Sequence, residues 1–143
     1  MRVLAWFQLV VGGGIVGLWP LLILAGEVPE LAAGQRDIWF HIAAEVIAGL
    51  LLITAGIGLL RGGGDRTRLL AAFALGALLY TGINSAGYYA DLGQWVPTLL
   101  LVSVGVAAGG ALTVLVRGGT SPARPPTSSW RDSSGADRSP AGT

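Results

Sequence analysis

The sequence predicts an all-α fold: a bundle of four transmembrane helices in up-down-up-down order, followed by a disordered C-terminal tail. The chain has 143 residues, of which 52% are hydrophobic and only 12% charged. Soluble domains average about 25% charged residues, so this chain has too few polar side chains to cover a globule in water. Four apolar segments are also each about 20 residues long, the length a helix needs to cross a bilayer.

The four predicted spans cover about residues 3–25, 38–60, 69–90 and 95–116. The second and third are joined by RGGGDRTR, and the third and fourth by DLGQ. Such short linkers make neighbouring helices antiparallel. Pro20 lies inside the first span and should kink or end that helix, because proline lacks the N–H of one helix hydrogen bond.

The basic residues predict the orientation of the spans. Eight of the nine lie at the N-terminus, in the linker between spans two and three, or after span four. Since basic residues favour the cytoplasmic side, we expect a multi-pass protein of the plasma membrane with both termini in the cytoplasm. The lipid bilayer is then its main partner.

The C-terminal segment differs in composition from the rest of the chain. Residues 118–143 consist mostly of Gly, Pro, Ser and Thr. Such a segment buries too little apolar surface to offset its conformational entropy. We therefore expect residues 1–117 to form one membrane domain and residues 118–143 to form a disordered cytoplasmic tail.

Several functional classes are disfavoured by composition and motif content. A net charge of +1 disfavours a nucleic-acid partner, and the absence of cysteine excludes disulfides and thiolate chemistry. No nucleophile elbow, P-loop or dinucleotide motif occurs in a suitable context. Asp37 and Glu45 would lie about 12 Å apart on a helix, too far to share one ion. We expect no metal, no cofactor and no enzymatic activity.

The second span opens with the segment DIWFHIAAE, which holds the only histidine of the chain. Asp37, His41 and Glu45 are four residues apart and share one helix face. Glu45 would lie about 10 Å inside the span. Intramembrane acids are costly and usually face the bundle interior, so His41 and Glu45 are candidates for ligand binding or proton relay.

The third span offers the complementary polar side chains. Tyr80, Asn84 and Tyr88 are also four residues apart, and Asn84 should lie at the depth of Glu45. We therefore expect Glu45 to contact Asn84 or Tyr80. The candidates for the mouth of an outer pocket are Asp37, Trp39, Ser85 and Trp95.

Two interpretations of this polar cluster stay open. It could be a set of hydrogen bonds that fixes helix pairing, each contributing about 0.6–2 kcal/mol. It could also line a pocket, since histidine changes charge near neutral pH and can carry protons. We favour a structural or accessory membrane protein with an outer polar pocket for a small ligand. A proton-linked transporter or channel component working as an oligomer, and a quinone-linked redox partner, are the alternatives.

Small residues four apart recur in every span, and such faces let membrane helices approach closely. They predict a tight bundle, and a surplus face could serve a homodimer. The pairs are Gly13 and Gly17, Ala44 and Ala48, Ala72 and Gly76, Gly82 and Ala86, and Gly105 and Gly109.

The segments WFHIAAEVIAGLLLITAGIGLL and YTGINSAGYYADLGQW resemble those of a family of small four-span prokaryotic integral membrane proteins. The shared features are His-x-x-x-Glu at the start of span two and Asn-Ser-x-Gly-Tyr-Tyr at the end of span three. Size and span count are also similar to those of DoxX-like membrane proteins, although span one lacks their Gly-x-x-Lys-like ending. The resemblance implies a four-span membrane protein and no particular activity.

Overall fold

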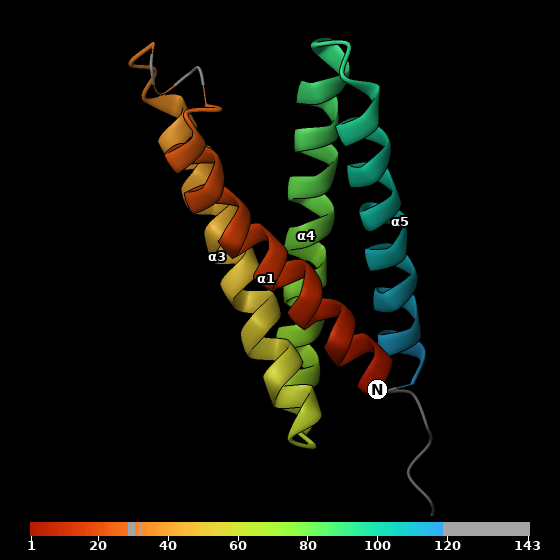
Figure 1. The fold of residues 1–143 in the computed structure, drawn as a ribbon. Helices are drawn as coiled ribbons and strands as arrows, with labels where there is room; N and C mark the ends of the chain where they lie inside the picture. The colour runs from red at the N-terminus through yellow and green to blue at the C-terminus, as the bar shows by residue number, and fades with distance from the viewer. Residues whose placement is uncertain (29–30, 32, 119–143) are drawn as a thin grey trace, which may run out of the picture.

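The computed structural model describes residues 1–28, 31 and 33–118 of the chain (Figure 1). Within this part the regular structure consists of four long helices and no strand, as predicted. They are α1 (Arg2–Ala25), α3 (Asp37–Leu60), α4 (Asp65–Asp91) and α5 (Trp95–Arg117). Each is long and apolar enough to cross a membrane. The predicted tail lies almost entirely outside the described residues, so its disorder and the domain boundary stay predictions.

The helix ends follow from local chemistry. After α1, Gly26 adopts a φ of 72°, which favours glycine, and the N–H groups of Gly26 and Glu27 donate to the carbonyls of Ile23 and Leu22. A similar glycine, Gly62, reverses the chain after α3. Pro20 does not end α1, which continues to Ala25. Of the two predicted effects of Pro20, only a kink stays a prediction.

The helices form two pairs, α1 with α3 and α4 with α5, and the pairs meet along α3 and α4. In Figure 1 the pairs lie close together at the end of the bundle that holds the N-terminus and diverge towards the other end. We call these the Met1 end and the Trp95 end. The Met1 end also holds the turn after α3 and the end of α5, where Gly118 lies near Met1.

Glycines bring α1 and α3 into close contact. A Cβ on Gly12 would lie 2.6 Å from the carbonyl oxygen of Gly49, and one on Gly56 would lie 2.9 Å from that of Ala5. The face predicted from Gly13 and Gly17 is not the one used, because a Cβ on either glycine would meet nothing within 4 Å. The register of the contact is therefore shifted by one residue, about 100° around α1.

Two clusters of buried apolar side chains divide the bundle. The larger one fills the Met1 half and draws on all four helices. Its fully or nearly buried members are Leu52, Ala55, Ala71, Ala74, Leu75, Leu78, Ala108 and Leu115. The smaller one, formed by Trp19, Val28 and Ile42, lies towards the Trp95 end and belongs to the α1–α3 pair. No residue of α4 or α5 in the described chain contributes to it.

Candidate functional site

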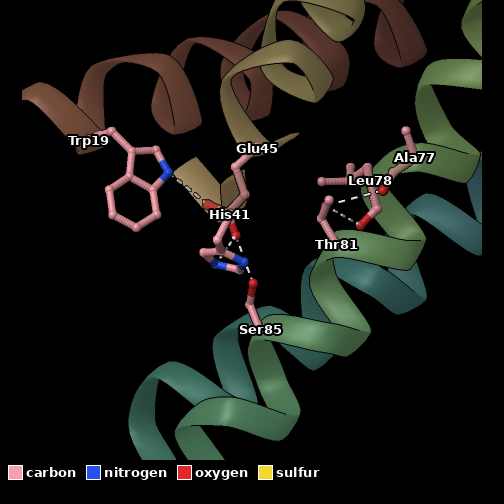
Figure 2. Close-up of polar contacts among 7 residues, drawn as sticks. All are labelled: Trp19, His41, Glu45, Ala77, Leu78, Thr81 and Ser85. Carbon is pink, nitrogen blue, oxygen red and sulfur yellow. Dashed lines mark hydrogen bonds and ion pairs between the residues drawn. The ribbon is translucent and has the colours of Figure 1, made fainter. Parts of the chain in front are cut away.

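The carboxylate of Glu45 is the centre of the polar contacts in the Trp95 half (Figure 2). Glu45 lies two turns into α3, and it meets Trp19 from α1, His41 from the preceding turn of α3, and Ser85 from α4. We call these four residues the Glu45 junction. The junction connects the α1–α3 pair to the α4–α5 pair.

Each carboxylate oxygen has a defined partner. The indole Nε1 of Trp19 donates to Oε2 at 2.8 Å, and the hydroxyl of Ser85 donates to Oε1 at 2.7 Å. His41 Nε2 lies 3.3 Å from the same Oε1. An indole N–H can only donate, so Oε2 must act as an acceptor. The Trp19 and His41 rings meet edge to face, with centroids 6.0 Å apart.

Burial is unequal across the junction. Trp19 is 9% exposed and Ser85 3% exposed, whereas the Glu45 side chain is 17% and the His41 side chain 31% exposed. The two neutral donors are therefore buried between helices. His41 is the member that a molecule outside the bundle would reach first.

The predicted contact of Glu45 with Asn84 or Tyr80 was wrong. Ser85, the next residue after Asn84, makes the contact, while Asn84 is exposed and Tyr80 is 74% exposed. One residue along a helix turns the side chain by about 100°, so Asn84 and Ser85 cannot both face α3. The position of the contact along α4 was predicted to within one residue, but the side of α4 that faces Glu45 was not predicted.

Trp19 was missed as a site residue, although the sequence carried a signal for it. It lies six residues before the end of α1, and Glu45 lies eight residues after the start of α3. Since α1 and α3 are antiparallel neighbours, the two residues should lie at similar depth.

Of the other candidates, only Ser85 contacts Glu45, and it is buried in the junction rather than at the predicted pocket mouth. Asp37, Trp39 and Trp95 are exposed near the Trp95 end, and Tyr88 packs edge to face with Tyr89. Figure 2 also shows that the hydroxyl of Thr81 bonds back to carbonyl groups of its own helix, at Ala77 and Leu78.

Two surface hollows are lined by no residue of the junction, and both are apolar. One of about 480 Å³ runs along α1 near Trp6 and Val10, and one of about 270 Å³ lies between α4 and α5, lined in part by Gly82 and Gly105. Among the described residues, no three His, Cys, Asp or Glu side chains gather as metal ligands would. An outer polar pocket stays a prediction, as does the expected absence of metal and cofactor.

The geometry of the junction allows two roles, one in fixing the helices and one in proton transfer. A carboxylate held by donors from two other helices is a clasp that fixes their relative position. A carboxylate and an imidazole at 3.3 Å can also share or pass a proton, and both are partly exposed. The first use needs Trp19, Glu45 and Ser85, whereas the second needs only His41 and Glu45.

One family model covers every residue that the structure describes. The model of a family described as "Domain of unknown function (DUF8058)" matches residues 1–121, which include all four helices and the Glu45 junction. Neither a curated protein nor a solved structure matches the chain. The chain therefore belongs to the DUF8058 family, whose function is unknown.

Proposed function

We propose that this protein is a non-enzymatic integral membrane protein with a structural or accessory role, and that its Glu45 junction supports a small-ligand site open to the outer side. The observation that carries the proposal is the carboxylate of Glu45, which accepts hydrogen bonds from Trp19 on α1 and Ser85 on α4. A polar side chain inside a membrane span is costly and usually has a role. Here the role is to join helices and to hold His41 in place.

The ligand site is proposed at the exposed side of the junction. His41 is the most exposed of the four residues, and it lies one turn from the start of α3 at the Trp95 end. Its ring is held by Glu45 and by an edge-to-face contact with Trp19. A small polar molecule that hydrogen-bonds to imidazole is the class of ligand this arrangement favours.

The proposed orientation puts the Met1 end in the cytoplasm of the cell. Arg2, Arg61, Arg66, Arg68 and Arg117 lie at or near that end, whereas the Trp95 end has Arg36 with the acids Glu27, Asp37 and Asp91. This asymmetry supports a plasma-membrane location with His41 on the outer side. A prokaryotic origin and a relation to DoxX-like proteins stay predictions.

Cysteine labelling tests both the site and the orientation, because the chain has no cysteine of its own. In intact cells, His41→Cys should react with a membrane-impermeant maleimide added outside. Ile47→Cys is the matched control, since Ile47 is 58% exposed on the same helix but lies deeper in the span. Asp37→Cys should react at once, and Arg61→Cys only after permeabilisation. The site is refuted if His41→Cys reacts no faster than Ile47→Cys.

A second function, proton-linked transport, is favoured by one observation. His41 Nε2 lies 3.3 Å from Glu45 Oε1, and both side chains are partly exposed. Purified protein in liposomes with an internal pH dye should then admit protons when a potassium diffusion potential is imposed. Glu45→Gln should lower the rate to that of protein-free liposomes. A wild-type rate equal to that of protein-free liposomes would rule this function out.

A further inference from the structure

Within the part of the chain that the structure describes, no other helix covers one face of α4. Its members are Gly76, Tyr80, Ile83, Asn84 and Gly87, which we call the α4 open face. Tyr80 is 74% and Ile83 66% exposed, and Asn84 is exposed as well. Gly82 faces α5, because a Cβ on it would lie 3.8 Å from the carbonyl oxygen of Leu101. Asn84 is two residues, or about 200° around the helix, from Gly82. It is about 100° from Ser85, which faces α3.

Two polar groups of this face lie within the apolar depth of a bilayer. Helix α4 has 27 residues, a length of about 40 Å, against about 30 Å of hydrocarbon. Asn84 and Tyr80 lie seven and eleven residues before Asp91, or about 10 and 16 Å from that end of the helix. A membrane-spanning α4 therefore presents an amide and a phenol to lipid.

These two side chains differ from other exposed polar side chains of the spans. The hydroxyls of Thr54, Ser103 and Thr113 each donate to a carbonyl four residues earlier in their own helix. Among the described residues, Tyr80 and Asn84 have no such hydrogen-bond partner. A polar group left unpaired in an apolar medium is costly, so a partner from another molecule is expected at this face.

The same face has room for a close approach. A Cβ on Gly76 or on Gly87 would meet nothing within 4 Å, so neither glycine serves a contact within the described chain. The two are eleven residues apart, about three turns, and therefore lie on one side of α4. Exposed glycines of this kind let a second helix approach the backbone around Tyr80 and Asn84.

We infer that the α4 open face is the interface of a homodimer, with α4 packed against α4 of a second copy. A twofold axis along the membrane normal brings equivalent residues together at equal depth. An amide and a phenol each carry a donor and an acceptor, so Asn84 and Tyr80 can pair with their own counterparts. Two copies of the α4 open face can therefore satisfy each other's hydrogen-bonding groups without a different protein. The inference requires that the bundle span a membrane, but it does not depend on the Glu45 junction.

Disulfide crosslinking in lipid tests the position of the interface. Full-length protein with Ile83→Cys, reconstituted at high lipid dilution and oxidised with copper phenanthroline, should form mostly covalent dimers. Leu18→Cys is the control, because Leu18 is 49% exposed on α1 and lies seven residues from its helix end, against eight for Ile83. Equal yields for the two variants, or only background for both, would overturn the proposal.

The polar pairing is tested by the dimer dissociation constant, measured by fluorescence energy transfer over a series of protein-to-lipid ratios. Asn84→Leu should weaken the dimer about threefold to 30-fold, the range for one interhelical hydrogen bond. Ser103→Ala, which removes an exposed hydroxyl already bonded within its helix, should leave the constant unchanged. Purified wild-type protein that stays monomeric would instead indicate a different partner and refute the homodimer. An unchanged constant for Asn84→Leu would show that this face is not the interface.

Discussion

The two halves of the bundle are held together in different ways. At the Met1 end, all four helices contribute to one apolar cluster, and Gly12, Gly49 and Gly56 bring α1 and α3 almost into backbone contact. At the Trp95 end, the smaller cluster belongs to the α1–α3 pair alone. There the hydrogen bond from Ser85 to Glu45 links that pair to α4. One half relies on close packing, and the other relies on a polar clasp.

For helices long and apolar enough to cross a membrane, this difference has a physical cause. Lipid tails are as apolar as leucine, so hydrophobic burial does little to hold two membrane helices together. Helices associate where small side chains allow close packing or where polar groups find partners across the interface. The glycine contacts and the Glu45 junction are the two solutions, used in different halves of one molecule.

The largest effect is expected where packing is closest. Gly12→Leu should lower the free energy of unfolding by about 3 kcal/mol or more, because the clashing atom is the backbone oxygen of Gly49, which cannot move aside alone. Gly13→Leu is the matched control, since a side chain at Gly13 meets open space. Unfolding in mixed detergent, followed by circular dichroism, measures both. Equal losses would mean that close approach does not hold the Met1 half.

The clasp is tested by Glu45→Leu, which removes the acceptor of two buried donors, Trp19 Nε1 and Ser85 Oγ. The expected loss of unfolding free energy in the same assay is about 1–3 kcal/mol. Glu45→Gln should lose less, because its amide oxygen can accept from Trp19 while its NH₂ donates to Ser85. If both variants are as stable as the wild type, the junction does not clasp the helices.

A smaller effect is expected on α4, where the structure and the sequence-based prediction give Glu45 different partners. The partner in the structure is Ser85, and the predicted one was Asn84. Ser85→Ala should lower the free energy of unfolding by about 0.5–1.5 kcal/mol, the net value of one hydrogen bond. In detergent at monomer dilution, Asn84→Ala should change it by less, because Asn84 is exposed and Ser85 is 3% exposed. The reverse order would place Asn84, not Ser85, in the clasp.

The smallest effect is expected at the one amide buried in the Met1 half. Gln8 is 0% exposed, its Nε2 donates to the carbonyl of Ala71 at 3.2 Å, and its Oε1 has no partner among the described residues. Gln8→Leu loses one hydrogen bond but also removes the unpaired oxygen, so the two changes should nearly cancel, to within about 0.5 kcal/mol. A loss above 1.5 kcal/mol would show that the Met1 half also depends on a polar link.

The fold was predictable because its signals are local and long. Each apolar segment is about as long as the bilayer core, and the short linkers leave antiparallel neighbours as the solution. Counting residues also showed that Glu45 and its partner on α4 lie at similar distances from their helix ends. The face that each helix turns to its neighbours did not follow, because most positions on every side of each span are apolar. A sequence without a clear polar stripe gives little indication of which residue faces which helix.

The Glu45 junction shows most clearly which properties follow from the sequence and which follow from the packing of the helices. The sequence by itself determined four apolar helices, an acid and a histidine one turn apart in the second of them, and an excess of arginine at one end. Only the tertiary structure decided that Gly12 rather than Gly13 meets α3, and that Trp19 and Ser85 rather than Asn84 meet Glu45. The reason is geometric: a single residue turns a side chain by about 100°, and helix rotation is set by packing between helices, which no single span encodes.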